Sequence, residues 1–314
     1  MNSWTKYILL SSLAVISIWR ITSGEWNIPL SEVIYFLLNG GNDPAAIVIR
    51  SVRLPRLLCS IGTGGLLSVA GAVLQGLLAN PLAEPYTLGI ASGAAFGASL
   101  GIMSGAFMTM PGAFAGALGA LVLTGIIARN GGNSKIILAG VISNAVLSAG
   151  VTFLKAIAGD RLGAVGLWLM GSFSGAGGRD VWAVYAGAVM VIVPAYILAP
   201  VIDAMSLGRD RAAILGVNER AVRIFLLVCC SMGVALCVSA FGVIGFVGLV
   251  VPHMARGIAG AGHRRVIVYA FLIGACLLGL ADGIAQRLGE LPVGVLTALC
   301  GGPFFCWILF CRPV

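Results

Sequence analysis

Charged residues are scarce in this 314-residue sequence. Asp, Glu, Lys and Arg together make up only 10% of it, whereas a soluble globular chain contains about 25%. So few charges cannot cover a surface that faces water, which excludes a soluble enzyme, a nucleic-acid-binding module and a disordered chain. Hydrophobic residues make up 59% of the chain. We therefore predict a protein whose solvent is mostly lipid.

Lysine and histidine are also rare, and this scarcity excludes particular chemistries. The three lysines, Lys6, Lys135 and Lys155, follow Thr, Ser and Leu, so none belongs to an ATP-binding G-x-x-x-x-G-K-[ST] loop. The two histidines form no ligand cluster for a metal. The eight cysteines form no C-x-x-C pair, and we interpret them as small buried hydrophobes. If ATP drives this protein, another chain must hydrolyse it.

Apolar stretches separated by charges, prolines or polar glycine clusters predict an all-α membrane protein with about ten transmembrane helices, in a single domain over residues 1–314. A membrane helix takes roughly 20 residues, and the 45 glycines suit close helix packing in a bilayer. The first stretch resembles a signal peptide, but no A-x-A site follows it, so we interpret it as the first helix. The predicted spans are 7–23, 54–78, 86–107, 112–128, 136–157, 181–200, 223–242, 244–259, 266–286 and 293–311.

The cations have an uneven distribution over these spans. If the N-terminus is cytoplasmic, alternation places eleven of the 19 Lys and Arg residues inside and eight outside, which is the expected sign but a weak bias. The C-terminus then also lies in the cytoplasm. Three of the outside arginines, Arg50, Arg53 and Arg56, recur every third residue at the start of span 54–78. Because cations are expected mainly on the inside, the position of these three needs a separate explanation.

A short internal match suggests an inverted repeat. Ser68-x-x-Gly71 followed by Pro81 recurs with the same spacing 171 residues later, from Ser239. This offset corresponds to five spans, an odd number, so the two copies would cross the membrane in opposite directions. Inverted repeats are common among transporters.

Polar groups inside the spans are few and mild, chiefly Gln75, Ser143 and Asn144. Such groups face protein or water rather than lipid. They either join helices by hydrogen bonds or line a wide pathway for a bulky solute. Two carboxylates near span ends, Glu84 and Asp282, are the candidates for ion coupling in a secondary transporter, although Asp282 is also expected to pair with an arginine such as Arg287.

One enzyme motif occurs. Gly97-Ala-Ser99-Leu-Gly101 fits G-x-S-x-G, and with His253 it suggests an intramembrane serine protease. A sequence this rich in glycine often contains a G-x-S-x-G match by chance, so the motif alone is weak evidence for a protease.

The longest polar connection covers residues 201–222 and lies inside in this topology. Its centre, from Arg209 to Ala221, is predicted to form a short helix that mixes small apolar and charged residues. A solvated linker is one interpretation, and a docking element for a cytoplasmic partner is the other.

Several longer motifs resemble the FecCD family, whose members are permease subunits of ABC importers for iron–siderophores, haem and cobalamin. The resemblance covers nearly the whole chain. The matching motifs include Arg53-Leu-Pro-Arg56, Gly71-Ala-Val-Leu-Gln75, Asn80-Pro-Leu-Ala-Glu-Pro85, Leu138-Ala-Gly140 with Asn144, Trp168-Leu-Met-Gly171-Ser172, Ser206-Leu-Gly208 with Leu215-Gly216, Gly245-Phe-Val-Gly-Leu-Val-Val-Pro-His253 and Glu290-Leu-Pro-Val-Gly294.

The resemblance implies an assembly in the bacterial cytoplasmic (inner) membrane. A second permease subunit forms a homodimer or related heterodimer, with the pathway at the dimer axis. Two cytoplasmic ATPase subunits bind ATP and Mg, and a periplasmic or lipid-anchored protein delivers the substrate. This chain itself would bind no cofactor, metal or nucleic acid.

The resemblance also implies roles for individual residues. Outer arginines would dock the binding protein, as their forked guanidinium suits carboxylates, although such arginines can also snorkel to lipid headgroups. The segment 206–221 would couple to the ATPase, and two inner loops would form gates. The docking residues are Arg53, Arg56 and Arg287; the coupling residues are Arg209, Ala212, Leu215 and Gly216; the gate and pathway residues are Asn80, Pro81, Leu82, Asn133, Ser134, Gln75, Ser143 and Asn144.

The sequence departs from the family pattern in one place and does not distinguish the substrate. Only Leu288 and Gly289 separate Arg287 from Glu290, so this outer connection is shorter than in the family. Within the family an iron chelate such as a ferric siderophore or haem is the commonest cargo, so we expect an iron chelate, with cobalamin as the alternative.

Overall fold

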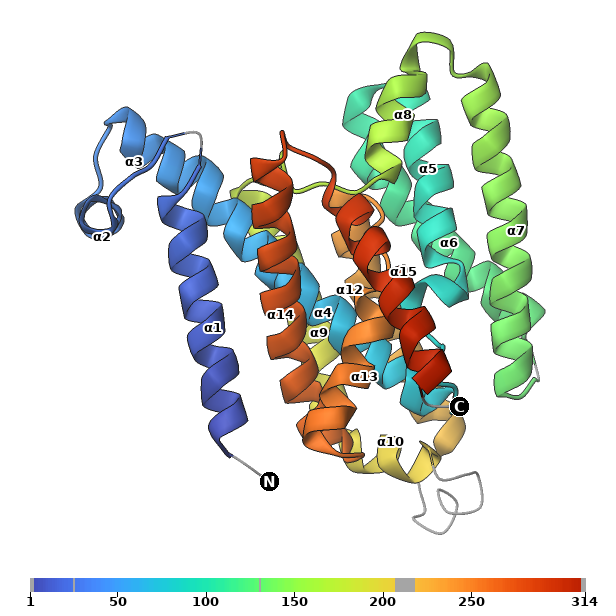
Figure 1. The fold of residues 1–314 in the computed structure, drawn as a ribbon. Helices are drawn as coiled ribbons and strands as arrows, with labels where there is room; N and C mark the ends of the chain where they lie inside the picture. The colour runs from blue at the N-terminus through green and yellow to red at the C-terminus, as the bar shows by residue number, and fades with distance from the viewer. Residues whose placement is uncertain (1–2, 25, 130, 207–217, 312–314) are drawn as a thin grey trace.

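The computed structural model describes residues 3–24, 26–129, 131–206 and 218–311, and their regular structure is helical (Figure 1). The larger helices are separated by short turns, including a π-helical turn at Ile49–Arg53 and a 3-10 turn at Pro85–Leu88. The α-helices are α1 (Ser3–Thr22), α2 (Leu30–Asn39), α3 (Pro44–Val48), α4 (Leu54–Leu77), α5 (Ile90–Ser104), α6 (Thr109–Ile127), α7 (Asn133–Ile157), α8 (Leu162–Leu169), α9 (Gly178–Ile197), α10 (Ala199–Ser206), α12 (Glu219–Phe241), α13 (Val247–Ala259), α14 (His263–Arg287) and α15 (Val293–Cys311).

Each predicted span coincides with one of these helices. Six stretches are long and apolar enough to cross a membrane by length and composition, and they contain α4, α6, α7, α9, α12 and α14. The predicted spans 86–107 and 244–259 correspond to the shorter helices α5 and α13. Helix α5 begins later than predicted because Gly89, at φ +86°, ends the 3-10 turn before it. The prediction of an all-α membrane protein is confirmed.

Helix α4 forms the centre of the bundle. It packs against α9, α12, α13 and α14, and almost all of its side chains are buried. Close approach depends on glycine: a methyl group at Gly71 would overlap the backbone carbonyl of Gly248 on α13, and one at Gly64 would overlap that of Gly274 on α14. Small residues at helix crossings allow such dense packing in a membrane.

Helices α6 and α7 lie toward one side of the bundle (Figure 1). Helix α6 packs closely against α5 through facing glycines, Gly97 and Gly112. Only 22% of the apolar window of α6, and 22% of that of α7, is buried within the chain. The exposed apolar faces of these two helices are therefore available to lipid or to another subunit.

The two ends of the bundle carry different groups of charged residues. The end of α1, the start of α4 and the end of α14 lie together at the top of Figure 1, and α10 lies at the bottom. Arg20, Arg56 and Arg287 thus share one end, which we call the outer end, as the sequence predicts. The assignment of the opposite, inner end to the cytoplasm stays a prediction.

The short internal match does not extend to local structure. Gly71 lies inside α4, whereas Gly242 ends α12 at φ +74°. Pro81 lies in the turn after α4, whereas Pro252 lies inside α13. The inverted repeat therefore stays a prediction.

The predicted coupling segment falls in a gap of the described structure. Helix α10 ends at Ser206 and α12 begins at Glu219. The coupling residues Arg209, Ala212, Leu215 and Gly216 lie in 207–217, outside the described residues.

Candidate functional site

A buried ion-pair network joins three helices at the outer end. We call Arg20, Arg56, Asp282, Gln286 and Glu290 the outer cluster. The Arg56 guanidinium donates from Nε to Asp282 Oδ2 at 3.0 Å and from Nη2 to Asp282 Oδ1 at 2.9 Å. Its Nη1 donates to Glu290 Oε2 at 2.7 Å. Arg56 therefore holds α4 to α14 and to the turn that follows α14.

Arg20, near the end of α1, binds the same carboxylate from another side. Its guanidinium donates to Asp282 and to Gln286. The Asp282 side chain is 1% exposed and those of Arg20 and Arg56 are 5% exposed. Buried charges need partners of this kind, because an unpaired charge in such a site loses its hydration without compensation. Asp282 is thus a structural counter-ion shared by two arginines.

Asp282 pairs with arginines, as the sequence predicts, but these are Arg20 and Arg56. Arg287 does not pair with Asp282; its guanidinium lies over the ring of Trp19, 4.9 Å from the centroid. The two residues are five positions apart on α14, which places them about 140° apart around the helix. Asp282 consequently faces the bundle, whereas Arg287 is exposed.

The short outer connection has a definite role in this arrangement. Gly289 and Glu290 both have left-handed backbone conformations, at φ +85° and +60°. The Leu291 amide bonds back to the Ala285 carbonyl at 3.0 Å. This tight turn folds Glu290 back over the bundle, where its carboxylate reaches Arg56.

Arg53 binds backbone instead of carboxylates. Its guanidinium donates to the carbonyls of Ile21, at 2.7 Å, and of Thr22 and Trp26. Cations stabilise the carbonyl end of a helix, so Arg53 caps α1. Arg53 and Arg56 are 8% and 4% exposed, and their donors are engaged within the chain. Their predicted docking role, like that of the exposed Arg287, stays a prediction.

A cavity of about 480 Å³ adjoins the outer cluster between the ends of α1 and α14. Trp19, Arg20, Arg287 and Glu290 are among the residues that line it.

At the inner side of α4, the irregular segment 78–89 is held by side chains from three helices. The Tyr86 carbonyl accepts from Asn144 Nδ2 at 2.9 Å, and the Leu88 carbonyl accepts from Thr124 Oγ1 at 2.9 Å. His253 Nε2 lies 3.0 Å from the Pro81 carbonyl oxygen. Non-helical backbone inside a membrane protein requires such partners. Polar residues on α6, α7 and α13 therefore fix the conformation of this segment.

Several of the predicted gate and pathway residues lie in the same segment or next to it. Ser143, on α7, is fully buried and bonds to Thr124 Oγ1 at 3.0 Å. Asn80 Oδ1 accepts from the Leu82 amide at 2.9 Å, and Leu82 is exposed. Asn133 and Ser134 begin α7. The structure thus places Asn144, Ser143 and the 80–82 turn in or beside segment 78–89, while their gating role stays a prediction.

Gln75 connects α4 to α13. Its Oε1 accepts from Arg256 and its Nε2 donates to the Leu249 carbonyl at 3.4 Å. Gln75 is only 4% exposed, and its predicted place at the pathway stays a prediction. Sequence reasoning missed Arg20 and Arg256 as site residues. The available signal was that a charge at the end of an apolar run needs a nearby partner.

Glu84, in the same segment, is largely enclosed by protein. Burial raises the pKa of its carboxyl to about 7, because desolvation disfavours the charged form.

The predicted Ser–His dyad is not formed. The Ser99 hydroxyl donates to the Ala95 carbonyl in its own helix at 2.7 Å, and His253 is engaged by Pro81. Ser99 is a buried packing residue. The serine-protease interpretation is therefore wrong.

Comparisons with known proteins agree with this architecture. The model of the FecCD transport family matches residues 12–311. The hemin transport system permease protein of Yersinia pestis is 38% identical over 85% of this chain and 84% of its own length. The cobalamin import system permease protein of Halobacterium salinarum is 37% identical over 88% of this chain and 76% of its own length.

A solved structure has the same fold as this chain. A metal-chelate type ABC transporter in an inward-facing conformation superimposes with a TM-score of 0.87, at 29% identity, covering 99% of this chain and 100% of that one. This chain therefore belongs to the FecCD transport family: it is a multi-pass transmembrane permease subunit of an ABC importer of the haem, iron-chelate or cobalamin type, and it is not itself the ATPase.

Proposed function

We propose that this chain carries a bulky iron chelate, a ferric siderophore or haem, across the bacterial cytoplasmic membrane. The observation that carries the proposal is the match to the FecCD family over residues 12–311 together with the 38% identity to a hemin permease. Cobalamin is the second candidate, since a cobalamin permease is 37% identical.

The proposed importer contains four membrane-associated subunits and a delivery protein. Two copies of this permease enclose the pathway, and their termini face the cytoplasm. Two ATPase subunits bind ATP and Mg beneath them and contact the segment that contains Leu215 and Gly216. ATP binding favours one of two permease conformations through differential contacts with this segment. The permease itself holds no cofactor.

Docking of the binding protein is proposed to use the exposed Arg287 and an exchange at Arg56. The Glu290 side chain is 45% exposed, whereas that of Arg56 is 5% exposed. A carboxylate on the binding protein can compete with Glu290 for the Nη1 side of Arg56 while Asp282 keeps the other side. Arg53 caps α1 at this surface and is the third docking residue in this proposal.

The exchange predicts opposite effects for two substitutions. Arg287→Glu should weaken binding-protein affinity several-fold, because it replaces attraction by repulsion at the rim. Glu290→Gln should strengthen binding, because it removes the competing carboxylate. Arg179→Glu, at an exposed arginine that begins α9, is the matched control. Weaker binding by Glu290→Gln would contradict the exchange.

Gating is proposed to act on segment 78–89. Because Asn144 and Thr124 hold its carbonyls from α7 and α6, and His253 from α13, movement of any of these helices must move the segment. The 80–82 turn and the loop at Asn133–Ser134 form the inner gates in this proposal, with Gln75 and Ser143 supporting them.

Uptake by proteoliposomes tests the proposal. The vesicles contain this permease with its ATPase and binding protein, and receive labelled ferric siderophore, haem or cobalamin with and without ATP. ATP-dependent accumulation of an iron chelate is expected. Accumulation of cobalamin alone would select the second candidate, and accumulation driven by an ion gradient without ATPase would overturn the proposed mechanism.

A further inference from the structure

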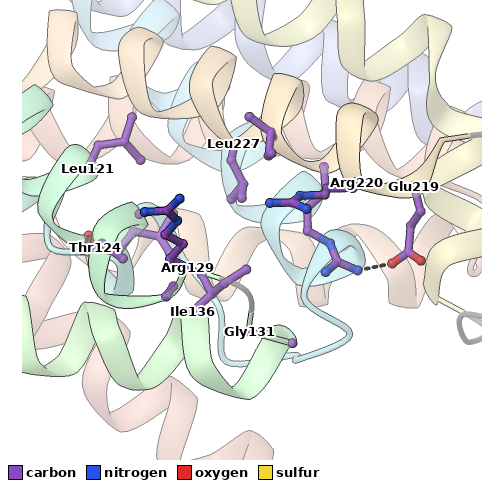
Figure 2. Close-up of a pocket in the computed structure, with 14 residues that line it drawn as sticks. Leu121, Thr124, Arg129, Gly131, Ile136, Glu219, Arg220 and Leu227 are labelled. Carbon is purple, nitrogen blue, oxygen red and sulfur yellow. Dashed lines mark hydrogen bonds and ion pairs between the residues drawn. The ribbon is translucent and has the colours of Figure 1, made fainter.

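A second cavity, of about 610 Å³, opens at the inner end between α6, α7 and α12 (Figure 2). It lies away from the outer cluster. Among the residues that the structure describes, its charged lining consists of three arginines, Arg129, Arg220 and Arg223, and one glutamate, Glu219. Figure 2 shows Arg129 and Arg220 on opposite sides of this space. The lining therefore has an excess of two positive charges.

The position of these arginines on α12 is electrostatically unfavourable without an anion. Arg220 and Arg223 lie in the first and second turns of the helix, close to the positive end of its dipole, where cations are disfavoured. Glu219 pairs with Arg223. The described lining of the cavity therefore has one carboxylate for three arginines. A negatively charged ligand would neutralise both the arginines and the helix end.

One of the three arginines, Arg223, is itself largely buried. Arg223 is 9% exposed, and its Nε is buried with no hydrogen-bond partner. A buried guanidinium N–H without a partner loses free energy. This Nε has no exposed surface, so a ligand in the cavity does not reach it; Arg223 contributes its charge to the lining.

The remaining walls indicate what kind of anion is bound. Leu121 on α6 and Ile224 and Leu227 on α12 line the cavity, so much of it is apolar. Ile126 is 66% exposed and Ile224 is 52% exposed on the same two helices, on apolar surfaces that are available to lipid. A free phosphate would leave these apolar walls unfilled, whereas an acyl chain would cover them.

We propose that this cavity binds an anionic phospholipid at the membrane–water boundary. Its phosphate lies between Arg129 and Arg220, with the charge of Arg223 at the same wall. Its acyl chain follows the apolar walls outward between α6 and α12. Basic pockets between transmembrane helices are suited to acidic headgroups. The bound lipid would adjoin Leu88 and Gly132, which flank the two proposed gate loops.

Native mass spectrometry of the permease–ATPase complex tests this site. The complex is equilibrated with an equimolar mixture of phosphatidylcholine and phosphatidylglycerol, and the retained lipids are identified. Retention of phosphatidylglycerol over phosphatidylcholine is expected. The double variant Arg129→Gln/Arg220→Gln should lower phosphatidylglycerol affinity by about 25-fold, from roughly fivefold for each arginine near an anionic lipid.

The control removes the same charge from the same end of the protein outside the cavity. Lys6→Gln/Arg264→Gln serves this purpose. Lys6 lies near the start of α1, and Arg264 lies at the start of α14 with its guanidinium over the Tyr196 ring. This variant should retain phosphatidylglycerol like the wild type. Equal losses in the two variants would overturn the proposal in favour of diffuse attraction.

Two further arms use the wild-type chain and so do not depend on how a variant folds. Inorganic phosphate is added as a competitor, and it should not displace phosphatidylglycerol at equal concentration. Equally strong binding of inorganic phosphate would refute a lipid site. The permease without its ATPase is compared with the complex; loss of the lipid on ATPase binding would assign the cavity to the protein interface and overturn the proposal.

Discussion

Asp282 is expected to be the most sensitive single residue at the outer end. Asp282→Asn removes the negative charge but keeps the size of the side chain, so it isolates the electrostatic contribution. After this change Arg20 keeps Gln286 and Arg56 keeps Glu290, but neither arginine has a buried counter-ion. The network then contains two cations and one half-exposed carboxylate.

The burial of each partner sets the free-energy cost of removing a carboxylate from the outer cluster. The Arg20–Asp282 and Arg56–Asp282 pairs join side chains that are 5% and 1% exposed. Removing one partner of a buried pair costs roughly 3–5 kcal/mol. The Arg56–Glu290 pair includes a carboxylate that is 45% exposed, so solvent screening limits the cost of Glu290→Gln to about 1 kcal/mol. Two carboxylates on one arginine thus differ severalfold in their effects.

Thermal unfolding of the purified permease in detergent measures this difference. Asp282→Asn should lower Tm by on the order of 5–15 °C, and Glu290→Gln by a few degrees at most. Arg56→Gln combined with Asp282→Asn should cost less than the sum of the two single changes, since the charges removed interact directly. Equal and small shifts for Asp282→Asn and Glu290→Gln would refute the assignment of Asp282 as the buried counter-ion.

The remaining predictions concern coupling, chemistry and packing. Leu215→Glu with Gly216→Glu should abolish substrate-stimulated ATP hydrolysis in the assembled complex while the permease still folds; an intact stimulated ATPase would contradict the coupling role. Ser99→Ala should leave ATP-dependent uptake unchanged, because the hydroxyl only bonds within its own helix. Gly71→Leu should prevent folding, as measured by size-exclusion yield, because any Cβ there overlaps the Gly248 carbonyl. Gly119→Leu, where a Cβ meets no atom within 4 Å, is the control and should be tolerated.

The sequence alone determined the long apolar helices, whereas the short helices α2, α3 and α8 lie outside every predicted span. A segment that crosses a bilayer must satisfy its backbone hydrogen bonds internally and present roughly 20 apolar residues. Both requirements are local, so α6, α7 and α14 can be predicted from composition. The family resemblance was also available from sequence, because motifs such as Asn80-Pro-Leu-Ala-Glu-Pro85 are contiguous.

Tertiary structure alone decided what the polar residues do. The partners of Asp282 are 262 and 226 positions away, at Arg20 and Arg56, and the only signal in the sequence was that each charge needed some partner. Asn144 was predicted to line or flank a pathway, yet its amide bonds to the Tyr86 carbonyl, because the path of segment 78–89 depends on how α4, α6 and α7 pack. Local pattern specifies helices through local hydrogen bonds and hydrophobicity, whereas the pairing of buried charges depends on contacts that exist only after the helices have assembled.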